Sequence, residues 1–366
     1  MKTESEKIAV CICTYKRPQL LRRLLDDIAA QERRPSFLIV VDGDPESGEV
    51  YKLLEGFEMT GSRIFYQPSN HANLAYQRYL GWKIAHHLRA GILIYFDDDL
   101  RLHSSKAVSR LAEVLEQDAC IVAATASMRF GSPEKMSGQR LLQERGTGKH
   151  SWVRYFWGAH SLPAGGLTSY GTRSVPEPSA EPFQEVEWLR GGVMAFRMSG
   201  LEQRCFSEDL FAMNHIGCGL GEDTLLARRV RHKGKLVLLQ HLDIEHPHDD
   251  LPKAYPVHPF AFGFSSAYSR RLLNDNFRGF APPRLSDRWA LLKSFFGNFL
   301  ISWGKALLSF RKDRILFALG YSKGVFWGLL KSPKARTLTP SMRWWEDADK
   351  DFAEHVEIRE GTLRAG

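Results

Sequence analysis

A repeated order of apolar strand, helix and apolar strand in the first part of the chain constrains its fold most strongly. Each strand is a short apolar run, and the helices between them have amphipathic spacing, the first one opened by Pro18. Strands that alternate with helices predict an α/β fold with a mostly parallel central sheet and flanking helices. The predicted strands are 7–13, 36–41, 63–67 and 92–96, and the predicted helices are 18–31 and 73–90.

Polar clusters follow three of these strands, at residues 14–17, 42–44 and 97–99. The carboxyl ends of parallel strands lie along one edge of an open sheet, and ligands of such folds bind at that edge. We therefore expect the three clusters to meet and to form a binding site.

Asp97, Asp98 and Asp99 are the most acidic of these clusters. Adjacent carboxylates repel one another unless protons or a cation intervene, and hard divalent ions take oxygen ligands. An acidic turn that caps the next helix is the simpler explanation of any one such cluster. The neighbouring polar clusters favour a metal site.

Two histidines, His246 and His248, follow a predicted strand at 235–240. A histidine pair is weak evidence by itself, but one imidazole beside the acidic cluster would complete the coordination of a metal. A zinc site made of His241, His246, His248 and His258 is an alternative. Structural zinc sites usually include cysteines, and none is near these histidines.

Glu222 and Asp223 open a predicted helix at 221–233. The helix dipole stabilises carboxylates at this end, so helix capping is one explanation of the pair. The other is that one carboxylate accepts a proton from an attacking hydroxyl, a role worth about 10² to 10⁴ in rate. The two explanations are compatible.

The later part of the chain differs in character. Residues 131–182 are rich in Gly, Ser and Pro and predict long loops, which we expect to form the acceptor wall. Residues 270–343 hold fifteen Lys and Arg against three acids, within a net charge of +8. Helices are predicted at 289–308 and 315–330.

The two late helices are apolar and basic together. The uncharged stretch between Lys293 and Lys305 has eleven residues, whereas a membrane-spanning helix needs about twenty. The pattern suits helices that lie at an anionic membrane surface; packing against the catalytic domain is the alternative. Aromatic residues among basic ones also occur in RNA-binding proteins, but no nucleic-acid motif is present and no nucleic-acid partner is expected.

The start of the chain predicts no export, because the apolar run at 8–12 is too short for a signal peptide. The five cysteines contain no CxxC pair, which favours a reduced, cytoplasmic protein. With the basic helices, this predicts a cytoplasmic protein that is peripheral on the inner face of the plasma membrane.

Five segments in this order resemble the signatures of the family 2 glycosyltransferases. They are CTYKRP at 13–18, VVDGD at 40–44, the segment 70–81, FDDD at 96–99 and GED at 221–223. The resemblance covers roughly the first 250 residues and implies a GT-A catalytic domain over 1–255 that binds a nucleotide sugar. Residues 256–366 would then form a helical, basic and aromatic extension.

The resemblance also implies roles for single residues on the donor side. Asp99 would hold Mg²⁺ or Mn²⁺ on the donor diphosphate with His246, and His248 is the reserve ligand. The remaining donor-binding residues would be Thr14, Arg17, Asp42, Arg78, Asp97 and Asp98.

On the acceptor side, the resemblance makes Asp223 the general base, with Glu222 orienting Asp223 or the acceptor. The acceptor would be a glycan or a lipid-linked hydroxyl, and the reaction a single displacement with inversion at the anomeric carbon. The glycine-containing segment near the acceptor would supply Trp188, Arg190, Gly191 and Gly192.

Three other functions fit parts of the pattern. A nucleotidyltransferase that makes the sugar nucleotide would need a glycine-rich phosphate loop, and residues 13–18 contain no glycine. A metal-dependent hydrolase acting on a phosphorylated sugar would use the same His and Asp residues. A binding protein with a decayed site is opposed by the complete acidic motifs.

Overall fold

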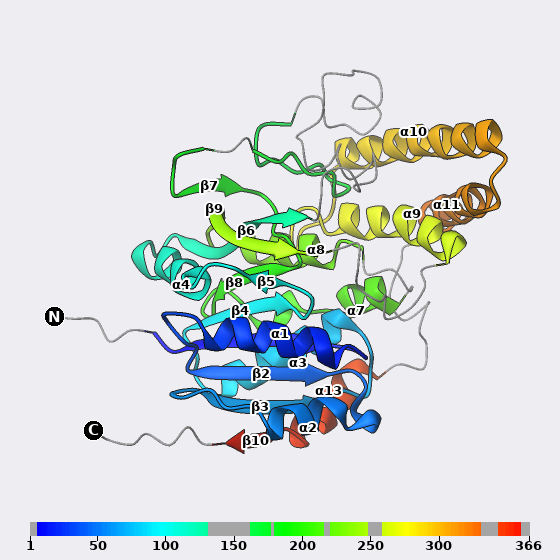
Figure 1. Cartoon of the computed structure of the whole chain (residues 1–366). Coiled ribbons are helices and arrows are strands. Elements are labelled where there is room, and N and C mark those ends of the chain that lie inside the picture. The colour runs from blue at the N-terminus through cyan, green and yellow to red at the C-terminus, as the bar shows by residue number, and fades with distance from the viewer. Residues whose placement is uncertain are drawn as a thin grey trace.

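The computed structural model describes residues 6–130, 162–176, 179–215, 220–247, 258–330 and 343–359. In these ranges, helices cover both faces of one ten-stranded sheet (Figure 1). The strands are β1 (Ile8–Thr14), β2 (Phe37–Asp42), β3 (Arg63–Pro68), β4 (Ile92–Asp97), β5 (Arg101–Leu102), β6 (Ile121–Phe130), β7 (Phe183–Val186), β8 (Val193–Arg197), β9 (Lys235–His246) and β10 (Val356–Arg359). Their order across the sheet is β10-β3-β2-β1-β4-β8-β6-β9-β5, and β7 pairs with β9.

The helices include the predicted ones and several that the sequence pattern did not predict. They are α1 (Pro18–Ala29), α2 (Glu49–Glu55), α3 (Leu74–His87), α4 (Ala107–Gln117), α7 (Glu208–His215), α8 (Glu222–Arg231), α9 (Pro259–Asp275), α10 (Leu285–Ser309), α11 (Lys312–Leu330) and α13 (Trp344–Ala353). The predicted α/β fold with C-terminal helices is confirmed.

The sheet is parallel in its first half and mixed in its second, where β6 and β9 pair in parallel. Strands β3, β2, β1 and β4 run parallel, as predicted. Strand β8 lies antiparallel between β4 and β6, and β5, β7 and β10 are antiparallel to their neighbours as well. The predicted mostly parallel arrangement therefore describes the first half, whereas the second half is mixed because β8 enters through a turn at 190–193 rather than through a crossover helix.

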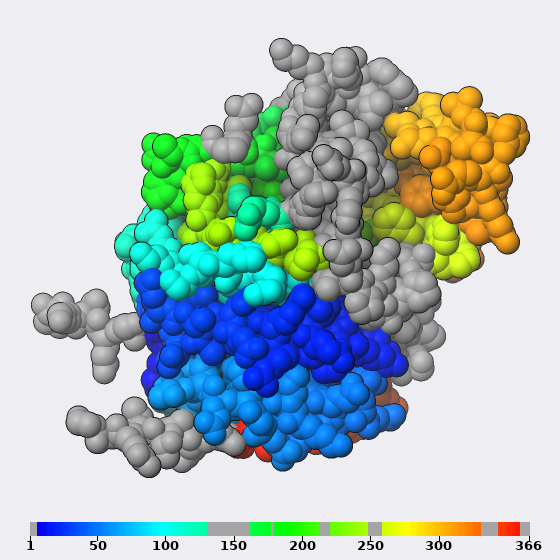
Figure 2. Space-filling model, in the orientation of Figure 1, coloured from blue at the N-terminus to red at the C-terminus, as the bar shows by residue number. Residues whose placement is uncertain are grey.

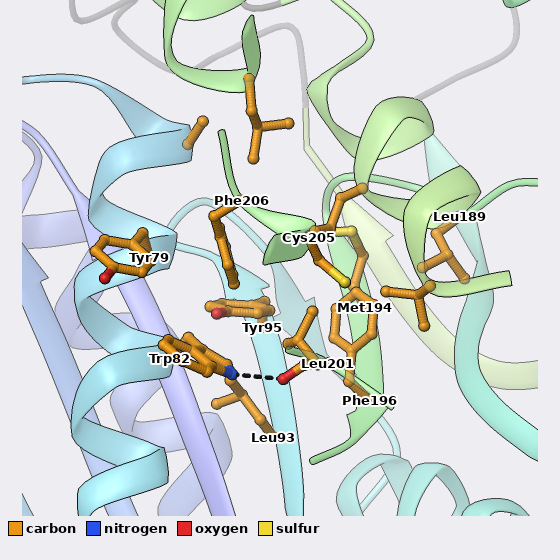
Figure 3. Packing of buried hydrophobic residues seen from close by; sticks show 14 of the residues in the cluster. Tyr79, Trp82, Leu93, Tyr95, Leu189, Met194, Phe196, Leu201, Cys205 and Phe206 are labelled. Carbon is orange, nitrogen blue, oxygen red and sulfur yellow. Dashed lines mark hydrogen bonds between the residues drawn. The ribbon is translucent and has the colours of Figure 1, made fainter. Parts of the chain in front are cut away.

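Strand β1 lies at the centre of both cores. All seven of its residues are buried, and alternate side chains face opposite sides of the sheet. Cys11 faces the layer that holds α3, α7, α8 and α13, whereas Val10 faces α1, α2 and α4. Figure 3 shows the first of these cores, in which Trp82 of α3 donates a hydrogen bond from Nε1 to the carbonyl of Leu201 at 2.8 Å.

Helices α9 and α11 cross at very close range. A Cβ atom on Gly263 would overlap the carbonyl oxygen of Phe317, and one on Gly320 would overlap that of Phe260. Only glycine allows two helix backbones to approach this closely. Helix α10 packs beside this pair and makes the small core of Leu291 and Phe295 with Tyr321.

The C-terminal strap, residues 343–359, returns to the sheet and comprises α13 and β10. Strand β10 pairs with β3, and Glu357 accepts two hydrogen bonds from the Arg63 guanidinium at 2.7 and 2.6 Å. Asp351 is buried and accepts hydrogen bonds from the Asn70 amide at 3.0 Å and the Tyr76 hydroxyl at 2.9 Å. The strap thus holds the loop that follows β3. The domain division at residue 255 remains a prediction, although this late segment completes the sheet of the earlier one.

Within the described residues, no helix combines the length and the apolar character needed to cross a membrane.

A carboxylate-rich candidate site at the sheet edge

The ends of β1, β2 and β4 bring the three polar clusters together. Thr14 is opposite Asp42 in the pairing of β1 with β2, and Cys13 is opposite Asp97 in the pairing of β1 with β4. The expected meeting of these segments at one sheet edge is confirmed. In the turn that follows β1, Lys16 has φ +56°. This left-handed conformation is costly for a residue other than glycine and is often found at functional sites.

Asp98 is the buried member of the aspartate triplet. Its carboxylate accepts a hydrogen bond from the Thr14 hydroxyl at 2.7 Å and forms an ion pair with Arg17 at 2.6 Å. Burial raises the pKa of Asp98 to about 7 although the Arg17 charge opposes the shift. Because the side chain is fully buried, Asp98 would contribute to donor binding through Thr14 and Arg17.

The side chains of Asp97 and Asp99 meet that of His246, which stands at the end of β9. One ligand atom from each of the three lies within 4.8 Å of the others. Asp99 Oδ2 is 3.1 Å from Arg17 Nη1, while Oδ1 lies 3.5 Å from His246 Nε2 and is buried without accepting a hydrogen bond. A buried carboxylate oxygen without a hydrogen bond, beside a second carboxylate and an imidazole, fits a divalent cation.

The other histidines named from the sequence add no ligand to this cluster within the described residues. His248 is outside the described residues, as is much of the predicted acceptor wall at 131–182. In the described ranges, neither His241 nor His258 belongs to a group of three potential metal ligands, so the alternative zinc site finds no support among them.

Arg78 of α3 joins the metal-type cluster to the carboxylates of α8. Its guanidinium donates to Asp97 at 3.1 Å, to Glu222 at 3.3 Å and to the Gly191 carbonyl at 2.9 Å. Burial alone would lower the pKa of Arg78, but the two carboxylates outweigh burial and raise it. The side chain is buried and engaged with protein groups, so its predicted contact with the donor is not apparent.

Glu222 and Asp223 open α8 after Gly221, whose φ of +91° turns the chain into the helix. Burial and the charge of Asp223 raise the pKa of Glu222 to about 7, against the opposing effect of Arg78. Asp223 accepts hydrogen bonds on Oδ2 from the Gly191 amide at 3.0 Å and on Oδ1 from the Thr224 amide at 2.6 Å. The two carboxylates therefore differ in their surroundings, which is typical of groups that divide acid and base roles.

The segment 188–192 lies between the metal-type cluster and the carboxylates of α8. Trp188 is fully buried and Arg190 nearly so, which makes Trp188 a core residue; the predicted acceptor-side role of the segment remains a prediction. The Gly192 carbonyl accepts a hydrogen bond from the Asp97 amide at 3.0 Å. A Cβ atom on Gly192 would lie 3.1 Å from Met128 Sδ, so a side chain is accommodated poorly at this position.

Asp42 ends β2 in the interior of the protein. Its carboxylate accepts hydrogen bonds from the Tyr66 hydroxyl at 3.1 Å and from the Asp44 amide at 2.9 Å, and burial raises its pKa. Gly43 has no room for a side chain, because a Cβ atom there would lie 2.9 Å from Gln77 Nε2. The predicted ribose contact of Asp42 remains a prediction.

Arg173 is a site residue that the sequence did not reveal. Its Nη2 donates to Asp223 Oδ2 at 3.0 Å and its Nη1 donates to the Leu189 carbonyl at 3.1 Å. It stands in an aperiodic loop without a motif, so no local signal distinguishes it from the other arginines of the chain.

Comparisons with known proteins give one family match. The family described as Glycosyl transferase family 2 matches residues 9–166. No curated protein matches the chain.

Solved structures that resemble the chain have low sequence identity to it. Mannosyltransferase PcManGT from Pyrobaculum calidifontis, in complex with GDP-Man and Mn²⁺, is 15% identical with a TM-score of 0.47, covering 96% of this chain and 88% of that one. TarS 1-349 from S. aureus, in complex with UDP-GlcNAc, is 13% identical with a TM-score of 0.45, covering 88% and 91%. Glucosyl-3-phosphoglycerate synthase from Mycobacterium tuberculosis, in complex with Mn²⁺, UDP and phosphoglyceric acid, is 13% identical with a TM-score of 0.40, covering 76% and 80%.

Proposed function

Residues 9–166 match glycosyl transferase family 2, and on this premise we propose that the chain transfers a sugar from a nucleoside diphosphate donor to an acceptor hydroxyl. The observation that carries the proposal is the pair of carboxylate groups on either side of Arg78. Asp97 and Asp99 form a metal-type cluster with His246, and Glu222 and Asp223 lie across the guanidinium. A cation site for a diphosphate beside a carboxylate for a hydroxyl proton is the arrangement that sugar transfer needs.

The donor binds at the edge formed by β1, β2 and β4 in this proposal. Thr14 and Arg17 line the pocket from the first loop, and Asp98 fixes both of them through the contacts described above. Asp42 supports the same edge from β2. Since Arg78 is held by two carboxylates, we assign it to the alignment of Asp97 with Glu222 and not to direct donor binding.

Asp97, Asp99 and His246 would hold Mn²⁺ or Mg²⁺, with His248 as the reserve ligand. When bound, such an ion supplies Lewis-acid stabilisation of the charge that develops on the leaving diphosphate. The two carboxylates suit Mn²⁺ or Mg²⁺, and the imidazole would complete the donor set. The protein contributes the placement of these ligands at the ends of two strands, β4 and β9.

The acceptor reacts beside α8. Asp223 accepts the proton of the acceptor hydroxyl while the hydroxyl oxygen bonds to the anomeric carbon, and the bond from that carbon to the diphosphate oxygen breaks. The nucleoside diphosphate leaves with the bonding electrons, and the configuration inverts because attack and departure occur on opposite faces. Glu222 orients Arg78 and Asp223 in this step, and Gly191 gives Asp223 a fixed amide donor.

Donor binding is the first test of the proposal. We expect one class of UDP, GDP or TDP sugar to raise the melting temperature in the presence of Mn²⁺, because a ligand selective for the folded state stabilises it with the logarithm of its concentration. The shift should vanish in EDTA. If no nucleotide sugar shifts the melting temperature while simple phosphate esters are hydrolysed, the chain is a hydrolase and the proposal fails.

We also propose a membrane surface as the place where a glycan or lipid-linked acceptor is met, in surface polysaccharide or glycolipid synthesis. Helix α10 exposes large apolar side chains at spacings of three, four and seven residues, which places them on one face. They are Leu285, Trp289, Leu292, Phe296, Leu300 and Leu307. This helix stands at the side of the molecule (orange in Figure 2).

Exposed cations accompany this apolar face, among them Arg288, Lys305, Arg311 and Lys312. Large apolar side chains on one face of a helix, with basic residues beside them, suit the interfacial region of an anionic bilayer. The proposed contact is therefore peripheral and lies on the inner face of the plasma membrane.

Co-sedimentation with lipid vesicles tests this contact. We expect the protein to pellet with phosphatidylglycerol vesicles and not with phosphatidylcholine vesicles. A variant with Trp289→Ser, Phe296→Ser and Leu307→Ser should stay in the supernatant, because these exposed side chains supply apolar contact with lipid but little to the fold. Phe183→Ser, on exposed β7, is the matched control. Pelleting of the triple variant to the wild-type extent would contradict the membrane contact.

A further inference from the structure

Residues 167–174 form a loop, here called the 167–174 loop, that joins the C-terminal helices to the carboxylates of α8. The two sides of the loop face each other, with Leu167 bridged to Arg173 and the Thr168 amide bonded to the Thr172 carbonyl at 2.9 Å. Gly171 turns the chain with φ +90°. The loop is therefore internally ordered, and each end can be placed by its own contacts.

The tip of the 167–174 loop is inserted among the C-terminal helices. Tyr170 is buried in the small core of α9, α10 and α11, under the Arg270 guanidinium. A Cβ atom on Gly171 would overlap the side chain of Leu273 of α9, so tip and helix are in close contact. The Ser169 hydroxyl also donates to the Asp287 carbonyl of α10 at 3.4 Å.

Helix α8 is fixed to the same loop. Arg228, on the same helix as Asp223, donates to the Thr168 carbonyl at 2.5 Å and to the Phe277 carbonyl at 2.7 Å. Asp223 and Arg173 therefore sit on one connected frame, which is made of α8, the loop and the end of α9.

At the base of the 167–174 loop, Arg173 contacts Asp223. One guanidinium nitrogen donates to Asp223 Oδ2 at 3.0 Å, and the other donates to the Leu189 carbonyl at 3.1 Å, with the guanidinium over the Trp188 ring at 5.7 Å. The Arg173 side chain is 33% exposed and that of Asp223 is 7% exposed. A guanidinium is a planar, permanently charged donor, so two such contacts fix its direction.

We propose that Arg173 is a positioning residue for the reaction, on the basis of the proposed role of Asp223 as the base. With Arg173 and the Gly191 amide on Oδ2, and the Thr224 amide on Oδ1, the carboxylate plane is held in one orientation toward the acceptor. The C-terminal helices set that orientation through the 167–174 loop. Through the loop, the C-terminal helices help to position the reacting groups, in addition to their proposed contact with the membrane.

Steady-state kinetics on Arg173→Ala test the proposal, with the nucleotide sugar that stabilises the wild type and with release of nucleoside diphosphate as the readout. We expect kcat to fall about 10- to 100-fold, the rate equivalent of one charge-assisted hydrogen bond. The KM for the donor should stay within about twofold, because the proposal assigns Arg173 to the Asp223 carboxylate and not to the donor. Added guanidinium chloride at low concentration should restore part of kcat.

Arg33→Ala is the matched control. Arg33 makes a similarly exposed ion pair with Glu116 at 2.6 Å, outside the candidate site, so its loss should leave kcat unchanged. A value of kcat in Arg173→Ala equal to the wild type, or a loss of kcat shared by Arg33→Ala, would overturn the positioning role. An inactive wild type would instead refute the proposed function.

A second measurement does not depend on turnover. Carbodiimide coupling of an amine to Asp223, mapped by mass spectrometry, should be faster in Arg173→Ala than in the wild type, because the guanidinium covers Oδ2. Equal labelling of the two proteins would show that Arg173 does not hold the carboxylate.

Discussion

Asp223→Asn is expected to lower the rate of sugar transfer by about 10² to 10⁴, the usual contribution of a general base. The amide has nearly the shape of the carboxylate, and its single oxygen can still accept from the Gly191 amide, although its nitrogen then replaces the oxygen that accepts from the Thr224 amide. This change is local, so the fold and donor binding should persist. The measurement is kcat for nucleoside diphosphate release with acceptor, alongside the thermal shift produced by the donor. Loss of both activity and donor binding would mean that the variant perturbs the whole site.

Glu222→Gln is the matched control for this variant. The Glu222 carboxylate accepts a hydrogen bond from Arg78 on Oε1, and the amide oxygen of a glutamine preserves that contact. We expect a smaller loss of rate than in Asp223→Asn. The reverse order would assign the base role to Glu222, whose pKa is raised to about 7 by burial and by the charge of Asp223.

Asp99→Asn is expected to abolish the Mn²⁺-dependent part of donor binding and to lower transfer by about 10² to 10³, because a Lewis acid contributes several kcal/mol to stabilising the leaving diphosphate. Asn keeps an oxygen near Arg17 but removes the negative charge from the proposed ligand cluster. The readouts are the thermal shift with nucleotide sugar, with and without Mn²⁺, and the Mn²⁺ concentration that gives half-maximal activity. Asp26→Asn, an exposed residue of α1, is the control.

The outcome of the metal titration separates two possibilities. A raised Mn²⁺ requirement with activity regained at high concentration would support Asp99 as a ligand. An unchanged Mn²⁺ dependence in Asp99→Asn would place the cation elsewhere and would remove the cluster of Asp97, Asp99 and His246 from the mechanism.

The sequence was most informative where structure is local. The pattern of apolar and polar residues predicted β1, β2, β4, α1 and α3 within a few residues, because a buried strand and an amphipathic helix follow directly from side-chain periodicity. The amphipathic character predicted for α3 is wrong, because most of that helix is buried. The clusters at strand ends could be placed at one edge, since parallel strands share a direction.

Contacts between distant segments were not predictable from these patterns. The Asp223 carboxylate meets Arg173 across 50 residues, and α13 and β10 join the sheet beside β3 with Arg63 and Glu357 294 residues apart. Helix α9 was missed for a related reason. Glycine and serine residues weaken its intrinsic helix propensity, and the close crossing with α11 explains why Gly263 is there.

Strand β10 of the C-terminal strap covers the outer edge of β3, and this has a consequence for the synthesis of the protein. The outer edge of β3 stays open until β10 has been synthesised, which at about 5 to 20 residues per second takes roughly 15 to 60 s after Arg63 is added. An open strand edge is a template for pairing with another chain. During each round of translation, the nascent chain therefore passes through an interval in which a chaperone, or another growing chain, competes with β10 for the same row of backbone groups.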